Sequence, residues 1–414
     1  MPFSSISFSY FMLMLPIRKR LSILNCKSLR NASADMFTSP SKGFRGGDIT
    51  FNLSLEVEIM AKRAKVYFYD LRNKAAARFE DAIKILLEKL VDEQPLKGVV
   101  GIKVHMGEEG NVTHLRPEFI RCVVDFVREC NCEPVIFDTT TLYAGARSNG
   151  VSYLNLAARK GFNQATLGAP IVIGDGLKGD DGFIVKIDGI ELREVEVARI
   201  LRDLDSMIVV SHFKGHVTTG FGGAIKNLAM GCTTKKGKAA QHRAHMPIVI
   251  EESCVGCGSC TQRCMYGAIK VEGDKARIDY EKCVGCLECY FLCPNKALEI
   301  PSDGTDKLQI RLADAALAVL KSLSFKPLYL NAVVSVTPRC DCLGCVMTPL
   351  IGDIGLLSSL DPVAIDQACL DLVKSAAGGK NPFFEVNGVS GDKQLESSEK
   401  LGLGSRSYEL INIS

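Results

Sequence analysis

Short apolar runs alternate with segments of helical periodicity along most of the chain from residue 66 onward. Runs rich in Val, Ile and Leu, bounded by polar or turn residues, are typical of parallel strands buried on both faces. Such runs lie at residues 66–69, 99–104, 134–137, 171–173, 207–210 and 328–336. This alternation predicts an α/β fold with a mostly parallel sheet and flanking helices.

Helical periodicity is clearest in four segments, at residues 79–90, 117–127, 306–323 and 361–373. Pro117 stands at the start of the second segment, and Asp361 is placed to cap the fourth, which Pro362 opens. Strand and helix patterns therefore continue after the cysteine-rich middle of the chain. We predict an α/β domain in two parts, residues 60–246 and residues 305–414.

Eight cysteines form two copies of the spacing Cys-x2-Cys-x2-Cys-x3-Cys, offset by 29 residues. A cubane [4Fe-4S] cluster needs four converging thiolates, and in the bacterial two-cluster arrangement the last cysteine of each copy ligates the other cluster. The spacing therefore predicts two [4Fe-4S] clusters with exchanged fourth ligands. The first cluster is assigned Cys254, Cys257, Cys260 and Cys293, and the second Cys283, Cys286, Cys289 and Cys264.

Zinc ribbons and disulfides are the alternative uses of clustered cysteines. Zinc usually takes two Cys-x2-Cys pairs across a longer spacer, so the observed triplets favour iron–sulfur clusters. Between the two copies, apolar and polar residues alternate around Glu272-Gly273-Asp274, which predicts a hairpin. Residues 250–300 resemble the bacterial-type ferredoxins, with Met265 where that family usually has the proline seen at Pro294. The resemblance implies an inserted ferredoxin-like 2x[4Fe-4S] α+β module over residues 247–304.

A polar, glycine-rich stretch directly follows the apolar run at residues 207–210, where open α/β sheets bind ligands. A turn rich in glycine leads into a helical segment, so its N–H groups and Lys226 suit an anion. Four of the six histidines fall within 34 residues, although neither common nucleotide-binding pattern is present. We predict acid–base or anion-binding chemistry here, the alternative being satisfied structural side chains. The candidate catalytic residues are His212, His216, Lys226 and His242.

A third thiol group, Cys340, Cys342 and Cys345, follows the predicted strand at residues 328–336. Cys-x-Cys-x2-Cys can hold a soft metal, and Cys232 or His242 would complete four ligands if the strand ends are neighbours. The alternatives are a zinc site, a third cluster or three free thiols. The other cysteines in helical patterns, Cys122, Cys130, Cys132 and Cys369, are interpreted as core residues.

Composition narrows the choice of compartment and partner. The formal charge of +3 resides in residues 1–59, which hold seven Lys and Arg against four Asp and Glu, so the remainder is neutral. Scattered charge provides no stripe for nucleic acid. The apolar run at residues 8–17 is too short to span a bilayer. It also precedes the basic residues 18–20, whereas a secretory signal has its charges first. We expect no membrane partner and interpret residues 1–59 as a disordered extension, with a transit peptide as the alternative.

Seventeen cysteines in 414 residues are too few for a disulfide scaffold, and oxidants destroy the predicted clusters. We therefore expect a reducing cytoplasm. Hydrophobic residues make up 47% of the chain, and most of them lie outside the module of about 50 residues. They require a second, larger domain in the same chain to bury them.

Further motifs lie between residues 65 and 375. They are Gly101-Ile102-Lys103-Val104, Gly107, Arg116-Pro117-Glu118, Asp138-Thr139-Thr140, Tyr143, Arg147, Lys226-Asn227, Gly231-Cys232, Gly237-Lys238, Gln241-His242, Cys340-Asp341-Cys342, Asp353-Ile354-Gly355, Ser359 and residues 361–366. Together they resemble the iron–sulfur proteins grouped as domain-of-unknown-function family 362. That resemblance implies an α/β domain carrying a two-cluster ferredoxin module, without an established reaction. His216 to Lys226 is also similar to the cofactor-holding segment of nickel-pincer lactate racemases, which indicates a polar cleft.

The leading hypothesis is a cytoplasmic iron–sulfur oxidoreductase whose clusters pass single electrons to or from a site on the α/β domain. Its partner would be a redox protein or a small-molecule substrate. Two alternatives keep the clusters structural: a metal- or anion-dependent enzyme of the racemase or ligase type, and a maturation or carrier protein.

Overall fold

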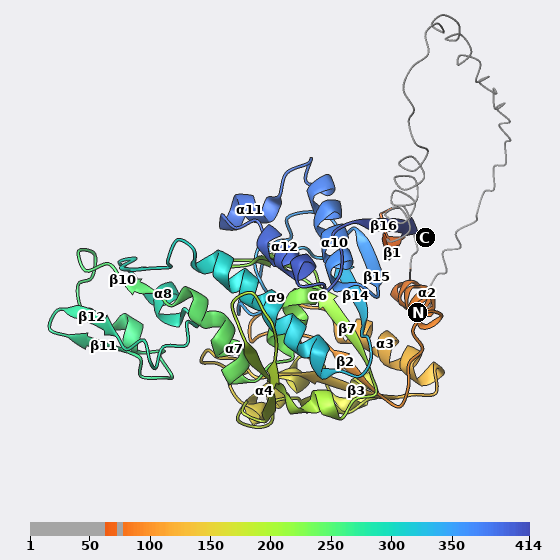
Figure 1. The fold of residues 1–414 in the computed structure, drawn as a ribbon, viewed down its shortest axis with the longest axis horizontal. Coiled ribbons are helices and arrows are strands. Elements are labelled where there is room, and N and C mark those ends of the chain that lie inside the picture. The colour runs from red at the N-terminus through yellow and green to blue at the C-terminus, as the bar shows by residue number, and fades with distance from the viewer. Residues whose placement is uncertain (1–62, 73–77) are drawn as a thin grey trace, which may run out of the picture. The chain divides into compact units, whose positions relative to one another are not determined.

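The computed structural model describes residues 63–72 and 78–414 (Figure 1). The prediction of a disordered extension at residues 1–59 concerns residues outside this part of the chain. The described chain builds an eight-stranded sheet and four two-stranded sheets. Within the described ranges, none of the helices has both the length and the apolar character that a membrane crossing requires.

The large sheet is mixed but nearly parallel. Its strands, in spatial order, are β16 (Tyr408–Asn412), β1 (Ala64–Asp70), β15 (Gly355–Ser359), β14 (Leu328–Val333), β7 (Ser206–His212), β2 (Val99–Lys103), β3 (Glu133–Asp138) and β4 (Ile171–Ile173). Only β15, among the described strands of this sheet, runs against its neighbours β1 and β14. The predicted α/β fold with a mostly parallel sheet is confirmed.

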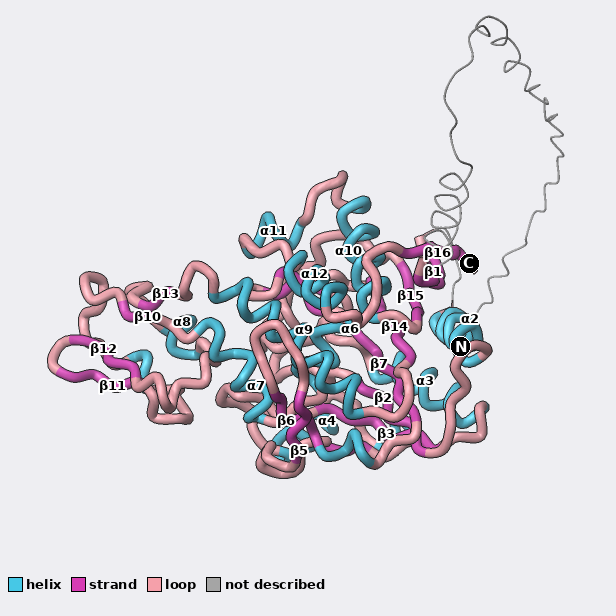
Figure 2. The backbone as a smooth tube through the Cα atoms, viewed as in Figure 1, coloured by secondary structure: helices cyan, strands magenta, loops and turns pink. Residues whose placement is uncertain are grey.

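Helices cover both faces of this sheet, as Figure 2 shows. They are α2 (Phe79–Val91) and α3 (Pro117–Glu129) on one face, and α6 (Ala224–Gly231), α9 (Gly304–Ser322) and α10 (Pro362–Ala376) on the other. Successive side chains of a strand point to opposite faces. In β7, Ile208 and Val210 accordingly enter the core under α2 and α3, whereas Met207 and Val209 enter the other core.

The predicted strands and helices are all present, with ends shifted by a few residues. Two further strands of the large sheet, β15 and β16, were not predicted. β15 is short and ends in two serines, and β16 is a half-exposed edge strand, so neither carries a strong apolar run. Both depend on pairing with strands far away in the sequence.

Smaller elements complete the layer around the sheet. They are α4 (Gly150–Arg159), α5 (Gln164–Leu167), β5 (Gly182–Lys186), β6 (Glu194–Ala198), β8 (Lys214–His216), β9 (Gly220–Gly222), α7 (Lys235–His242), α11 (Pro382–Asn387) and α12 (Asp392–Lys400).

The cysteine-rich segment lies between α7 and α9 and projects at the left of Figure 1. Its elements are β10 (Ile248–Val249), β11 (Ile269–Glu272), β12 (Lys275–Ile278), α8 (Glu288–Leu292) and β13 (Leu298–Glu299). β11 and β12 form the predicted hairpin, and β10 pairs with β13, so the segment begins and ends at the same place.

Candidate functional site

A cleft opens where the parallel strands β2, β3, β7 and β14 end. Parallel strands bring their carboxyl ends to one edge of a sheet, and the loops that follow carry the ligand-binding groups. The cleft holds about 150 Å³ of accessible space, enough for several water molecules or a small ligand. Polar side chains that line it include Lys103, His105, Asp138, Arg147, His212, His216, Lys226, Lys238, His242, Cys340 and Cys342.

A buried ion pair forms the floor between β2 and β3. Lys103, only 1% exposed, places its Nζ 2.8 Å from Asp138 Oδ1 and donates to Asn227 Oδ1 at 2.7 Å. Asp138 also accepts a hydrogen bond from the Tyr153 hydroxyl. Because each charge has partners, this pair is a rigid polar floor.

His212 lies at the end of β7 with both ring nitrogens engaged. Nδ1 is 2.8 Å from Asp341 Oδ2, and Nε2 is 2.9 Å from the carbonyl oxygen of Val334. A carboxylate and a carbonyl oxygen only accept hydrogen bonds, so each ring nitrogen of His212 faces an acceptor. Burial opposes ionisation of Asp341, but His212 and Lys214 hold the pKa of this carboxyl well below its usual range. His212 therefore positions the Asp341 loop and has no free ring nitrogen for a substrate.

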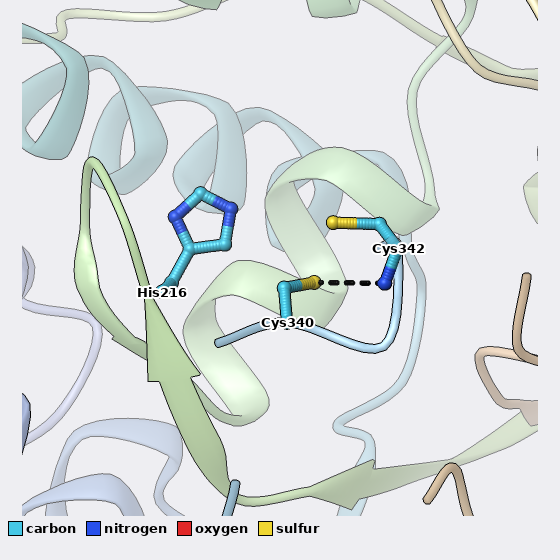
Figure 3. A group of neighbouring side chains, drawn as sticks. All are labelled: His216, Cys340 and Cys342. Atoms are coloured by element: carbon cyan, nitrogen blue, oxygen red, sulfur yellow. Dashed lines mark hydrogen bonds between the residues drawn. The ribbon is translucent and has the colours of Figure 1, made fainter. Parts of the chain in front are cut away.

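His216, Cys340 and Cys342 converge on one point of the cleft (Figure 3). One donor atom from each residue lies within 4.8 Å of the other two. The hydrogen bond with Cys342 and the charge of Lys226 lower the pKa of Cys340, although burial opposes this. The arrangement suits a soft metal ion.

Two cysteines of the predicted third metal set lie outside this group. Cys232 is fully buried in the core under α6, where burial raises the pKa of its thiol to about 12. Cys345 is exposed on the loop that carries Cys340 and Cys342. His216 takes part instead, because β8 follows β7, the neighbour of β14.

Further cationic and imidazole groups line the cleft. Burial and the charge of Lys226 hold the pKa of His216 well below its usual range, and burial with His245 does the same for His242. His242 Nδ1 is 3.0 Å from His245 Nε2. Burial lowers the pKa of Lys238 to about 8. Lys226 makes no hydrogen bond or ion pair with the described residues, so its ammonium group is the unpaired one among the cations that line the cleft.

The glycine-rich turn does not offer its helix N-terminus to an external anion. The N–H groups of Ala224 and Ile225 donate to the two carboxylate oxygens of Asp366, at 2.7 and 2.9 Å. Asp366 lies on α10 and is fully buried, which raises its pKa to about 6. The expected anion at this turn is thus a carboxylate of the chain itself, and Lys226 is left as the anion-binding group.

A second polar cluster was not predicted as catalytic. Arg147 Nη1 is 2.8 Å from His105 Nε2, and Arg147 Nε donates to Glu108 at 2.8 Å. Tyr143 accepts from the same guanidinium. The sequence feature that could have indicated this cluster is the position of Lys103 and His105 at the end of a predicted strand, since β2 ends at Lys103. Arg147 lies on a loop, and only the tertiary structure brings it there.

Two small cavities in the cysteine-rich segment are each lined by four cysteines. One is lined by Cys254, Cys257, Cys260 and Cys293, and the other by Cys264, Cys283, Cys286 and Cys289. In each half the trailing cysteine lies against the triplet of the other half. We name these groups the outer quartet and the inner quartet. Their members are those of the two predicted ligand sets, and cluster binding by them stays a prediction.

Backbone N–H groups point at three of these sulfur atoms. Ala276 donates to Cys254 at 3.3 Å, in the outer quartet. Ala268 donates to Cys264 at 3.3 Å and Ala297 to Cys293 at 3.2 Å, at equivalent positions of the two halves. Such N–H···S bonds stabilise thiolates and tune bound metal.

The inner quartet adjoins the cleft. Cys286 lines both the inner cavity and the cleft. Gly285 lies so close to the end of α7 that an added Cβ would be 2.1 Å from the carbonyl oxygen of His242. The Tyr266 hydroxyl donates to the carbonyl of Leu142 at 2.9 Å, which fixes the segment against the loop after β3.

Comparison with solved structures finds chains of low similarity. The lactate racemase apoprotein from Thermoanaerobacterium thermosaccharolyticum is 14% identical with a TM-score of 0.34, over 66% of this chain and 51% of that chain. A protein from Thermotoga maritima is 12% identical with a TM-score of 0.37, over 78% of this chain and 59% of that chain. The present chain thus spans less than two thirds of either. A search of curated proteins gave no match.

A protein family matches residues 100–371, more than half of the chain. The matched range includes the ends of β2, β3, β7 and β14, the loops that line the cleft and both cysteine quartets. The chain belongs to the family described as domain of unknown function DUF362.

Proposed function

We propose that this protein binds two [4Fe-4S] clusters and transfers single electrons between them and a small molecule in the cleft. The observation that carries the proposal is the double position of Cys286, in the inner quartet and in the wall of the cleft. Electron transfer needs ligation, burial and a short path, and a shared side chain provides such a path.

The residues of each quartet fit a cubane cluster. Four thiols surround each cavity, and three of the eight sulfurs already accept backbone N–H groups. Gly256 and Gly285 have left-handed φ of 64° and 70°, which lets each cysteine loop turn around its cavity. When bound, a cluster of this type supplies one-electron redox chemistry.

The outer quartet is the proposed entry for electrons from a partner protein. Cys257 is exposed, whereas Cys254 and Cys260 of the same quartet are buried. A redox partner could therefore approach the outer quartet, and the inner quartet would relay electrons to the cleft. The described cysteines are all free thiols, in keeping with a reducing compartment.

The cleft itself is proposed to hold a small anion. Among the cations that line the cleft, Lys226 has no hydrogen bond or ion pair with the described residues, whereas Lys103 and Lys214 are paired with Asp138 and Asp341. Lys226 would bind a carboxylate or phosphate group, and His242 would exchange a proton with the substrate. His242 adjoins the cysteine loop of the inner quartet, so proton and electron could reach the substrate from the same side.

The test is metal analysis of anaerobically purified protein. Two clusters require about eight irons and eight sulfides per chain. Substituting Cys264→Ala removes one ligand of the inner quartet, and we expect about four irons to remain. Cys369→Ala alters a core cysteine outside both quartets and should leave the iron count unchanged. Far fewer than eight irons in the unaltered protein, or equal counts in both variants, would contradict the proposal.

A redox experiment separates this function from one with structural clusters. Protein reduced with dithionite is mixed with candidate carboxylates or phosphates, and reoxidation of the clusters is followed by absorbance. An electron acceptor should reoxidise them in the unaltered protein and more slowly in Lys226→Met. Clusters that bleach while every bound molecule stays unchanged would favour a metal- or anion-dependent enzyme or a maturation protein.

A further inference from the structure

We propose a third metal site, separate from the two quartets, in which His216, Cys340 and Cys342 bind one zinc ion with a coordination position open to the cleft. The three donor atoms lie within 4.8 Å of one another before any ion is bound. Structural zinc sites have four protein ligands, whereas catalytic sites have three and an exchangeable position. Two cysteines and one histidine are a donor set that catalytic zinc uses.

The sheet brings the three ligands together. β7 and β14 are parallel neighbours, with Ala332 opposite His212, so the segments that follow them emerge side by side. His216 lies on β8, directly after β7, and the two cysteines lie on the loop after β14. The strands fix this approach across more than 120 residues of sequence.

Gly215 keeps His216 close to the cysteine loop. Its N–H donates to the carbonyl of Thr337 at 2.9 Å. An added Cβ would lie 2.1 Å from the carbonyl oxygen of Pro338, so the backbones approach more closely than any other residue would allow. The ligand geometry is therefore built into two backbone segments and does not depend on flexible side chains alone.

Groups around the ligands suit metal binding. The N–H of Cys342 donates to Cys340 Sγ at 3.4 Å, which stabilises a thiolate. His216 Nδ1 accepts a hydrogen bond from the backbone N–H of Thr218 at 3.3 Å and lies 3.4 Å from the Thr218 hydroxyl, so both groups of Thr218 orient the imidazole ring. In Figure 3 the imidazole and the Cys342 sulfur point toward each other.

The fourth position would face the substrate. All three ligands line the cleft, and Cys232 and Cys345 lie outside the group. Two thiolates balance the charge of Zn²⁺, so the site would bind and polarise an oxygen of the ligand held by Lys226. Soft sulfur donors favour zinc over magnesium or calcium.

The experiment uses the full chain with its iron complement, depleted of loosely bound metal and then titrated with Zn²⁺. We expect about one tightly bound zinc per chain, and X-ray absorption at the zinc edge should give two sulfurs at about 2.3 Å and a nitrogen at about 2.0–2.1 Å. His216→Ala and Cys342→Ser should each weaken zinc binding at least tenfold. Cys345→Ser, on the same loop but outside the group, is the matched control and should bind as the unaltered chain does.

Iron content measured on the same samples reports on folding and on the quartets independently of zinc. Unchanged iron in both ligand variants shows that a loss of zinc is local. The inference is overturned if all four proteins bind zinc equally, if none binds it, or if the zinc has four sulfur neighbours, as it would in a vacated quartet.

Discussion

Buried charges at the strand ends each have a specific set of partners. Removing Asp138 would leave the Lys103 ammonium without its carboxylate in a site from which water is excluded, a change that typically costs about 3–5 kcal/mol. Asp366 accepts two backbone hydrogen bonds at α6 and a third from Asn331 at 2.8 Å. Such residues fix the shape of the cleft, whereas Lys226 and His242 remain available to a ligand.

Lys238 gives a prediction about pH. Burial lowers the pKa of Lys238 to about 8 in the folded chain, from its ordinary value of 10.5, so between these pH values the unfolded chain binds more protons than the folded chain. Folding stability contributed by Lys238 should therefore rise as pH increases from about 8 to 10.5. The melting temperature of the unaltered protein minus that of Lys238→Met, measured from pH 7 to 10, should increase. A melting-temperature difference that stays constant with pH would contradict a lowered pKa of Lys238 in the folded chain.

Close backbone contact between elements places the inner quartet beside the cleft. Gly285 has a left-handed φ of 70° and lies against the last turn of α7. Its counterpart in the first half is Gly256, which lies against Asp274 of the module's own hairpin. The equivalent glycines of the two halves thus make different contacts: Gly256 within the module and Gly285 with the α/β domain.

Gly285→Ala should separate these elements. A methyl group there would meet the carbonyl of His242 at 2.1 Å, so the cysteine loop must move away from α7. We expect about 2–4 kcal/mol of destabilisation from the clash and the left-handed backbone together, seen as a lower melting temperature. Slower electron transfer to the cleft should accompany it.

Gly258→Ala is the matched control, because Gly258 has a similar φ of 77° and no atom within 4 Å of the added methyl. Backbone strain alone should cost this variant about 1 kcal/mol. Equal losses in the two variants would show that the contact with α7 contributes nothing.

At the scale of the whole molecule, the cysteine-rich segment is inserted at one point of the α/β domain. β10 pairs with β13, and a Cβ on Gly304 would lie 3.3 Å from the Cα of His245, so α9 starts beside the place where the segment leaves. Its buried apolar contact with the larger domain involves Leu142, Ala239 and Val284.

Deleting residues 247–303 and joining Met246 to Gly304 through a short glycine linker should therefore leave a folded α/β domain. We expect unchanged sheet and helix signals by circular dichroism, a cooperative melt at lower temperature, and no bound iron. The deletion exposes Leu142, so a second version carries Leu142→Gln, which replaces this apolar surface with a polar side chain. An unfolded product in both versions would show that the segment is an integral part of the core.

Local pattern was enough to predict much of this protein. The apolar runs at residues 99–104 and 207–210 are strands because only burial on both faces accommodates them. Asp361 accepts from Val363 and Ala364, as its position before Pro362 predicted. Cysteine spacing and the bacterial two-cluster arrangement predicted two ligand sets, and the same four thiols of each set line one cavity.

Contacts between distant segments decided the rest. Three features join residues more than 100 positions apart: the pairing of β1 with β15 and with β16, the hydrogen bonds from the start of α6 to Asp366, and the approach of His216 to Cys340. Sequence periodicity describes which face of an element is buried, but not which element lies next to it. Strand order alone determines that β7 ends beside β14, and the convergence of the cleft and its candidate metal ligands follows from that order.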